Sequence, residues 1–156
     1  MKITMRNAVR TFVALWYLMG WLLHVYLGLS APDTYRVFGG TALLPGYSAF
    51  WHNMVMPYIT VFALLLAAFE VLVGCLRISK EKWVKIGLVF SILFNLFLVQ
   101  MGLGYAVQDP LTGFLVNRLP NLIFMALQIP LLWGRDERSV IESLRKRFFK
   151  TNPANI

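Results

Sequence analysis

Long runs of apolar residues, separated by short clusters of charges, make up most of this chain. Four uncharged stretches of 22, 33, 23 and 16 residues follow Arg10, Arg36, Lys85 and Arg118. About 20 apolar residues span the hydrocarbon core of a bilayer, so the pattern predicts four transmembrane segments. Backbone groups in lipid must be hydrogen-bonded within their own segment, which makes helices the expected form. We expect these helices near 10–29, 51–76, 84–106 and 113–134.

Two segments do not fit a transmembrane span. Residues 30–50 are interrupted by glycine and proline and are rich in aromatic residues, which is typical of the membrane interface. We expect this segment on the outer side, either as a tethered loop or as a cover over the helices. In the basic tail, an amphipathic helix on the cytoplasmic surface is expected, because apolar residues share one helical face: Val140, Ile141, Leu144 and Phe148.

The predicted fold class is therefore all-α, an integral membrane four-helix bundle over residues 1–134 followed by a basic amphipathic tail over 135–156. Composition supports this class, because 58% of the 156 residues are hydrophobic, 14% are charged and the mean hydropathy is +0.64. Soluble domains average about 45–50% apolar and about 25% charged residues. The single cysteine, Cys75, excludes an internal disulfide and a cysteine-rich zinc site.

The basic residues predict how the chain is oriented. Of the 15 basic residues, only Arg36 and Arg118 lie on the side of the outer segment. The others are in the N-terminal segment, the loop between the second and third helices, and the tail. By the positive-inside rule, both termini are expected to be cytoplasmic, in a bacterial or archaeal cytoplasmic membrane. This rule and attraction to anionic lipid account for the net charge of +8, so no nucleic-acid partner is expected. Pro32 follows a cleavage-like site, so the first helix is expected to be an uncleaved anchor.

Each predicted helix carries a stripe of small or polar residues, the kind of surface through which helices associate in lipid. Counting about 1.5 Å of rise per residue from the basic ends places the polar side chains in two layers. The inner layer, at roughly 10 Å, contains Tyr17, Glu70, Ser91 and Gln128. The outer layer contains His24, Gln100 and Asn121 at roughly 21–23 Å, with Arg118 slightly further out. Asn95 lies between the layers.

Glu70 is the strongest candidate for a functional residue. A carboxylate within a span costs roughly 2.5–3.5 kcal/mol on insertion scales and is a functional hypothesis by default. Arg10 is its expected partner, because the long side chain can reach inward from the boundary of the first helix. Three roles remain open for Glu70: a structural ion pair with Arg10, a proton-handling or ligand-binding group, and a carboxylate that snorkels to the surface.

The other polar residues also have alternative interpretations. His24 is either a packed, hydrogen-bonded histidine or a ligand to a quinone carbonyl or a haem. Arg118 and Asn121 either cap and anchor the fourth helix or form an anion or carbonyl site that opens outward. Asn95 and Gln128 are expected to cross-link helices. The histidines and carboxylates have no metal-ligand spacing, and no nucleophile lies beside a base, so neither a metal site nor a catalytic residue is expected.

Several of these residues form a pattern known from one family. Arg10 opens the first helix, Gly20 lies within it, and Glu70 and Gly74 are one turn apart in the second. With the aromatic outer segment and the basic turn before the third helix, residues 6–134 resemble the DoxX/DoxD-like family of small four-helix membrane proteins. The resemblance implies a membrane partner in redox or oxidative-stress assemblies, such as the small membrane subunit of thiosulfate:quinone oxidoreductase.

We therefore expect an integral membrane accessory subunit of a larger redox complex, non-catalytic by itself, with lipid and other membrane subunits as partners. A quinone-interacting oxidoreductase subunit that uses Glu70 or His24 is the alternative, and a small oligomeric transporter is a further one. No covalently bound cofactor is expected, and the candidate ligand is a quinone or a lipid.

Overall fold

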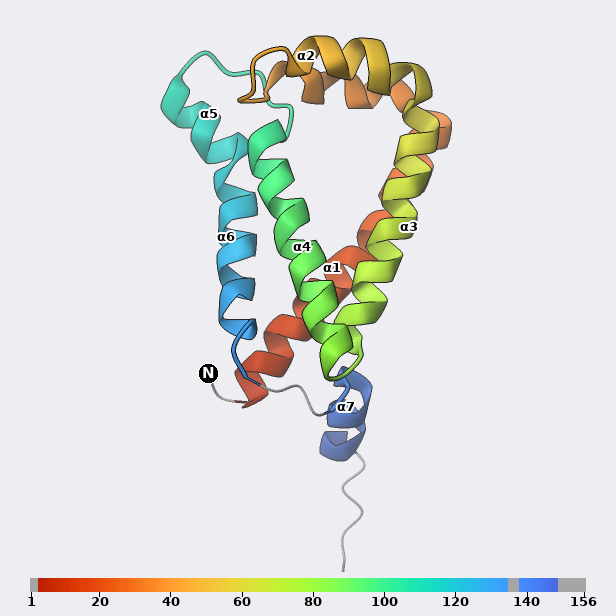
Figure 1. Ribbon diagram of the computed structural model, residues 1–156, viewed down its shortest axis with the longest axis vertical. Helices are drawn as coiled ribbons and strands as arrows, with labels where there is room; N and C mark the ends of the chain where they lie inside the picture. Colours follow the sequence, from red (N-terminus) through yellow and green to blue (C-terminus); the bar gives the residue numbers. More distant parts are fainter. Residues whose placement is uncertain (1–2, 135–137, 149–156) are drawn as a thin grey trace, which may run out of the picture.

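A computed structural model describes residues 3–134 and 138–148, and its regular structure is entirely helical within these ranges. Four helical units form the body (Figure 1): α1 (Ile3–Ser30), α3 (Ile59–Ile78), α4 (Lys82–Met101), and the pair α5 (Pro110–Asn117) and α6 (Leu119–Gln128). Three helices are long and apolar enough to cross a membrane, and a fourth crossing exists if the bent pair counts as one span. The predicted all-α class with membrane-spanning helices is thus confirmed at this level.

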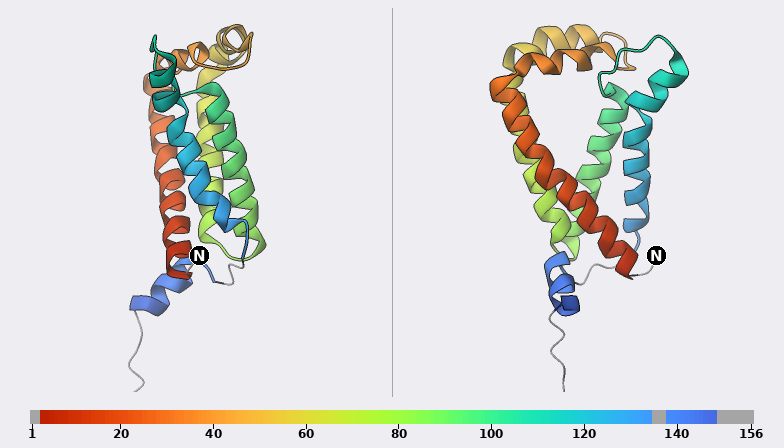
Figure 2. Two further views of the ribbon diagram at one scale, coloured as in Figure 1. Left: turned by 90° about the vertical axis from the view of Figure 1, so that its left-hand side faces the viewer. Right: turned by 180° about the vertical axis from the view of Figure 1, so that it is seen from behind.

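The two ends of the molecule differ in structure. One end, which we call the basic end, holds the N-terminus, the α3–α4 turn and α7 (Val140–Phe148) (Figures 1 and 2). At the other end lies the cap, a set of short helical segments across the ends of α1 and α3. The cap consists of η1 (Pro32–Gly40), α2 (Tyr47–Phe50), η2 (Trp51–Val55) and η3 (Met56–Tyr58).

The second predicted helix begins later than expected. Residues 51–58 belong to the cap, and α3 starts at Ile59. Pro57 explains the difference, because it has no backbone N–H and interrupts the helical hydrogen bonds. The cap is held together by aromatic packing, with Tyr47 stacked on Trp51 at 5.7 Å and the indole Nε1 of Trp51 donating to Tyr35 O at 2.9 Å.

The third and fourth predicted helices also differ at their ends. The third ends at Met101 rather than near 106, because Gly102 and Gly104 adopt φ of +82° and +83°, a left-handed conformation that ends the helix. The fourth is not one continuous helix over 113–134. α5 and α6 meet at an angle of 42° around Arg118, and Pro120 removes a donor at the start of α6.

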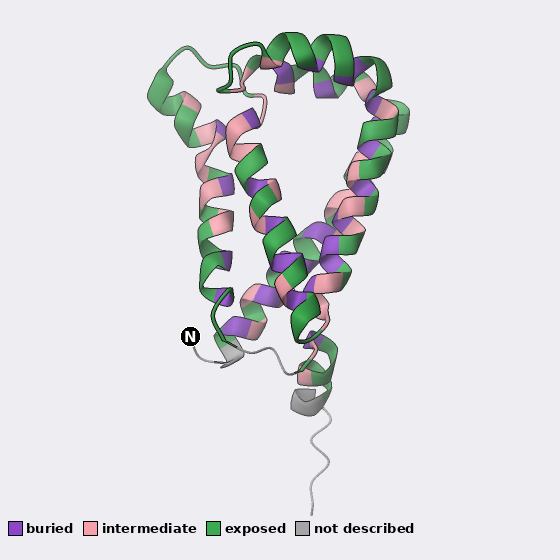
Figure 3. Cartoon of the chain, viewed as in Figure 1, coloured by how far each residue is buried: buried purple, intermediate pink, exposed green. Residues whose placement is uncertain are grey.

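Small residues bring α1 and α3 into close contact. Gly28 packs against Ala63, and Gly74 packs against Leu18. The hydroxyl of Thr60 donates to Gly28 O at 2.9 Å. This is the close approach of backbones that small residues permit between helices in lipid. Figure 3 shows buried positions recurring along one side of these helices, with exposed positions covering the outside.

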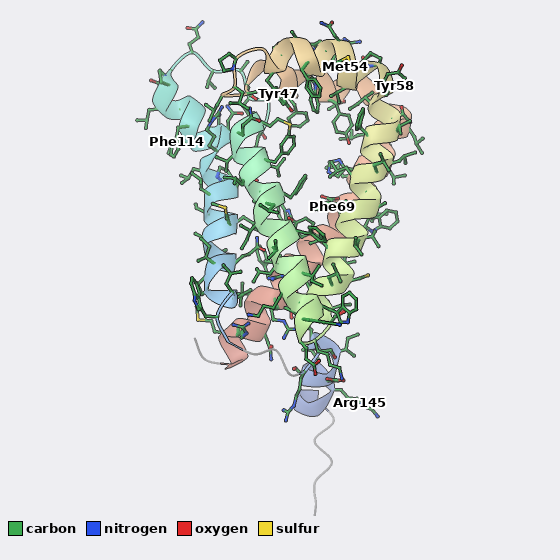
Figure 4. The ribbon with its side chains drawn as sticks, viewed as in Figure 1. Tyr47, Met54, Tyr58, Phe69, Phe114 and Arg145 are labelled. Carbon is green, nitrogen blue, oxygen red and sulfur yellow. The ribbon has the colours of Figure 1, made fainter. Side chains whose placement is uncertain are left out.

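α4 packs against α3 near the basic end and also against α6. Gly87 of α4 lies against Leu76 of α3. Toward the cap, the ribbons of α4 and α6 diverge from those of α1 and α3 (Figures 1 and 2). Aromatic side chains fill space between them: Phe69 projects from α3 toward α4 (Figure 4), and its ring centroid lies 5.2 Å from that of Phe94.

At the basic end, cationic side chains bind the carbonyls that end the helices. Arg6 donates to Leu131 O and Trp133 O, at 2.8 and 2.6 Å. Lys85 donates to Leu131 O at 2.7 Å and to the next carbonyl at 2.6 Å. Arg10, which is 1% exposed, donates to Ser79 O at 2.7 Å, just beyond α3. A cation at a helix C-terminus satisfies carbonyls that have no partner within the helix.

The basic tail over 135–156 is predicted to form a short amphipathic helix within 135–150, and residues 135–137 and 149–156 lie outside the described residues. α7 begins with a capping box, in which Ser139 Oγ accepts from Glu142 N and the Glu142 carboxylate accepts from Ser139 N. Val140 is buried against the helix ends, whereas Ile141 and Leu144 are exposed. The exposed apolar side chains are available to a membrane surface.

Candidate functional site

Glu70, His24 and Tyr35 form a row of polar contacts that links α3, α1 and the cap. Glu70 Oε1 lies 3.5 Å from His24 Nε2, and His24 Nδ1 lies 2.7 Å from the hydroxyl of Tyr35. The carboxylate side chain is 7% exposed and the imidazole is 21% exposed. Tyr35 is buried in the cap core. The row therefore places a carboxylate and an imidazole largely out of contact with solvent, with part of the imidazole still exposed.

The direction of side chains on a helix explains how these residues meet. Each Cα–Cβ bond leans toward the N-terminus of its helix. α3 runs away from the cap, so Glu70 leans toward the cap, while α1 runs toward the cap, so His24 leans toward the basic end. Gly20 supplies the necessary room, because a Cβ at that position would lie 2.8 Å from Glu70 Oε2. The local sequence thus creates the space that the carboxylate occupies.

This geometry corrects two expectations. The ion pair that the structure gives Glu70 is with His24 and not with the predicted partner, Arg10, which binds Ser79 O at the end of α3. Arg10 stays at the basic end because carbonyls are available there, whereas Glu70 leans the other way. The expectation that Glu70 and His24 occupy separate layers is also wrong, since the two side chains extend toward each other from different heights.

The hydrogen-bond roles follow from the state of Tyr35. Burial, and secondly the nearby Glu70 carboxylate, raise the pKa of Tyr35 from 10.0 to about 12. The phenol therefore stays neutral at pH 7 and can donate its O–H to Nδ1 of His24. That bond leaves the proton of a neutral imidazole on Nε2, facing Glu70. The second carboxylate oxygen, Oε2, is buried and has no hydrogen-bond partner among the residues that the structure describes.

A second polar cluster joins α1, α4 and α6. The Ser91 hydroxyl lies 3.0 Å from Tyr17 OH and donates to Gln128 Oε1 at 2.6 Å. Asn95 donates its amide to Tyr17 OH at 3.2 Å and to Ser91 O at 2.7 Å. The structure thus brings together three members of the predicted inner layer, with Asn95 beside them, and separates them from the fourth, Glu70. The polar groups of the cluster hydrogen-bond to one another and so cross-link α1, α4 and α6.

The remaining members of the predicted outer layer are separated from His24. Arg118 lies at the α5–α6 bend and donates to Thr41 O, and Asn121 is buried one turn further along α6. Gln100 lies near the end of α4, where its carbonyl accepts from Leu43 N at 3.0 Å. The contacts of Arg118 and Gln100 lie beside residues 41–43 rather than at His24, because α4 and α6 diverge from α1 and α3 toward the cap, and the common depth of the outer layer stays a prediction.

Sequence reasoning missed Tyr35, because its contact with His24 depends on the fold of the cap. The sequence shows that the outer segment is rich in aromatic residues, but no periodicity in an irregular segment identifies which phenol faces a helix.

Among the described residues, no group of three or more His, Cys, Asp or Glu could hold a metal ion.

None of the protein-family models, curated proteins or solved structures compared with this chain matches it. The DoxX/DoxD-like resemblance therefore stays a prediction. The fold and the site define a helical protein with helices long and apolar enough to span a membrane, which carries a buried carboxylate beside a partly exposed histidine under a cap.

Proposed function

We propose that the protein binds the carbonyl end of a quinone-like ligand at the Glu70–His24–Tyr35 row and exchanges a proton with it. The observation that carries this proposal is the contact between Glu70 and His24, continued through His24 to Tyr35. A buried carboxylate beside an imidazole can act as a proton donor or acceptor to a ligand oxygen within hydrogen-bond reach. The partly exposed imidazole provides the edge that a ligand can approach, and the surrounding apolar helices suit a membrane-soluble ligand.

The protein acts, in this proposal, as a membrane subunit, with electrons supplied by a cofactor-bearing partner protein. Both termini are placed in the cytoplasm, because the basic end carries the N-terminus and most of the basic residues. Membership of the DoxX/DoxD-like family is part of the same proposal. Its support is that two of the residues behind the resemblance, Gly20 and Glu70, pack directly on each other.

Quinone binding can be measured by quenching of tryptophan fluorescence, since Trp21 lies one helical turn from His24. A short-chain benzoquinone and a short-chain naphthoquinone are titrated into the purified full chain in mild detergent. We expect saturable quenching by the wild type and about tenfold weaker binding by Glu70→Gln, which replaces the carboxylate with an amide, or by His24→Phe, which removes the imidazole.

Glu81→Gln and His52→Phe are matched controls, because both residues are exposed and lie outside the row. Their affinities should equal that of the wild type. If all five proteins bind both quinones equally, or none binds either, the proposed site is wrong. Unfolding temperatures of the variants separate loss of the site from loss of the fold.

The accessory-subunit role is tested separately by isolating the protein from its native membrane in mild detergent and identifying what co-purifies. A stoichiometric set of cofactor-bearing subunits supports it. A homo-oligomer without partners contradicts it and favours a self-contained ligand or transport site.

A further inference from the structure

The α5–α6 bend collects hydrogen-bond donors that lack acceptors. Arg118 Nε, Asn121 Nδ2 and Gln100 Nε2 are all buried, and within residues 3–134 and 138–148 none of these atoms has a hydrogen-bond partner. Asn121 is only 8% exposed as a whole residue. Buried polar groups are nearly always hydrogen-bonded, so three such donors in one region require an explanation.

The three residues flank one short segment that follows η1. The Arg118 guanidinium donates to Thr41 O, and the main-chain carbonyl of Gln100 accepts from Leu43 N, so the guanidinium and the Gln100 backbone both lie beside residues 41–43. Asn121 follows Arg118 by one helical turn, a spacing at which side chains on a helix are neighbours. Unpaired donors of α4 and α6 therefore belong to residues at the same end of the helix pair.

Among the buried polar side chains that the structure describes at this end, Tyr47 also has an unpaired hydroxyl, whereas Asn117 is fully hydrogen-bonded. Asn117, one residue before Arg118, has every group in use: Oδ1 accepts from Leu103 N and Tyr105 N, and Nδ2 donates to Tyr105 O. Asn117 shows that the loop can provide partners for all the hydrogen-bonding groups of an asparagine that stabilises the fold.

The charge of Arg118 is also uncompensated. In the part of the chain that the structure describes, no carboxylate lies within ion-pair distance of it, whereas Arg36, the other basic residue on this side, pairs with Asp33 at 2.8 Å. Arg118 is both the C-cap of α5 and the N-cap of α6, so the opposite partial charges of the two helix ends meet there and the guanidinium is the main source of positive charge. The site thus combines a cation with two amide donors.

We propose that Arg118, Asn121 and Gln100 bind a phosphate group, from a lipid headgroup or a free phosphate ion. Phosphate oxygens accept several hydrogen bonds at once, and guanidinium is the side chain best suited to them. This site is separate from the Glu70–His24–Tyr35 row and does not depend on the function proposed there.

The test titrates the delipidated full chain in neutral detergent with short-chain phosphatidylglycerol and, in a second arm, with inorganic phosphate. Thermal unfolding and native mass spectrometry report binding. Wild type and Arg36→Gln, the matched control, should bind equally, and Arg118→Gln should bind about 10- to 100-fold more weakly. An Arg118-dependent response to the lipid alone assigns the phosphate to a headgroup, and the same response to inorganic phosphate assigns it to a free ion. No response in either arm, or equal binding by Arg118→Gln and the wild type, overturns the proposal.

The variant Asn121→Asp tests the phosphate site even if Arg118→Gln does not fold. The new carboxylate would lie one turn from Arg118 and supply the missing acceptor from within the chain. We expect this variant to unfold at the same or a higher temperature without ligand and to lose the response to phosphate. Asn121→Asp that binds like the wild type would contradict the proposal.

Discussion

A methyl group added at Gly28 would test the close approach of α1 and α3. The Cβ of Gly28→Ala would lie 2.7 Å from the Cβ of Ala63, whereas non-bonded carbon atoms rest at about 3.5–4.0 Å. Both atoms are attached directly to helix backbones, so no rotamer change relieves the overlap and the helices must separate by roughly 1 Å. Overpacking of this kind costs about 1–3 kcal/mol. Separation also lengthens the 2.9 Å hydrogen bond from Thr60 to Gly28 O.

A second substitution tests whether the overlap with Ala63 causes the loss of stability. In an Ala63→Gly background, the atoms nearest the new methyl would be Thr60 O at 3.8 Å and the Cα of residue 63 at 4.0 Å, which are ordinary contacts. The double variant Gly28→Ala/Ala63→Gly should therefore recover most of the lost stability. Ala63→Gly alone should cost about 1 kcal/mol, because glycine is a poor helix former. The matched control is Gly40→Ala, whose Cβ would meet nothing within 4 Å.

The assay is reversible unfolding of the four α1–α3 proteins and the control in mixed micelles, followed by circular dichroism and analysed as a double-mutant cycle. A stable Gly28→Ala variant would refute the close packing of the two backbones. A destabilised Gly28→Ala that is not relieved by Ala63→Gly would show that the cost arises elsewhere.

Three further predictions concern the other contacts. Ser91→Ala removes the bonds to Tyr17 and Gln128 and should cost about 0.6–1.7 kcal/mol in thermal unfolding, the range of hydrogen bonds between membrane helices. Arg6→Gln should cost about 1.5–3 kcal/mol and raise hydrogen exchange at the end of α6, because charge-assisted bonds to two carbonyls are lost. Since the pKa of Tyr35 is raised from 10.0 to about 12 in the fold, its stabilisation is fully present below pH 10 and lost as the pH rises toward 12. The late rise in phenolate absorbance should be smaller by one tyrosine in Tyr35→Phe than in the wild type, because burial also raises the pKa of Tyr47 to about 12.

The inward faces of the helices could be predicted because lipid leaves few ways to hold helices together. Small and polar residues at helical spacing mark contact surfaces in a membrane, since apolar side chains gain little by leaving lipid. The contact among Tyr17, Ser91 and Gln128 follows this rule, because all three lie at a similar distance from the basic ends of their helices. Helix ends were less predictable, as the departures at Pro57 and Gly102 depend on local backbone conformation.

The partner of Glu70 could not be predicted by counting residues from the membrane boundary. Counting estimates the height of Cα atoms, whereas an ion pair depends on where the charged atoms lie. In antiparallel helices, side chains lean in opposite directions, so Glu70 and His24 meet although their Cα atoms differ in height. Tyr35 adds a contact from an irregular segment, for which no periodic rule exists.

The arginines at the two ends of the molecule have different hydrogen-bond partners, because the two ends offer different acceptors. At the basic end, α3 and α6 both finish and present carbonyls near their ends, which Arg10 and Arg6 bind. At the cap end, α5 finishes and α6 begins at Arg118, so the two helix ends present both acceptors and donors there. The α4 carbonyls at that end already accept from the neighbouring loop, Met101 O from the Thr41 hydroxyl and Gln100 O from Leu43 N. Three side-chain donors, Arg118 Nε, Asn121 Nδ2 and Gln100 Nε2, remain without a partner among the described residues, and a bound phosphate would satisfy them.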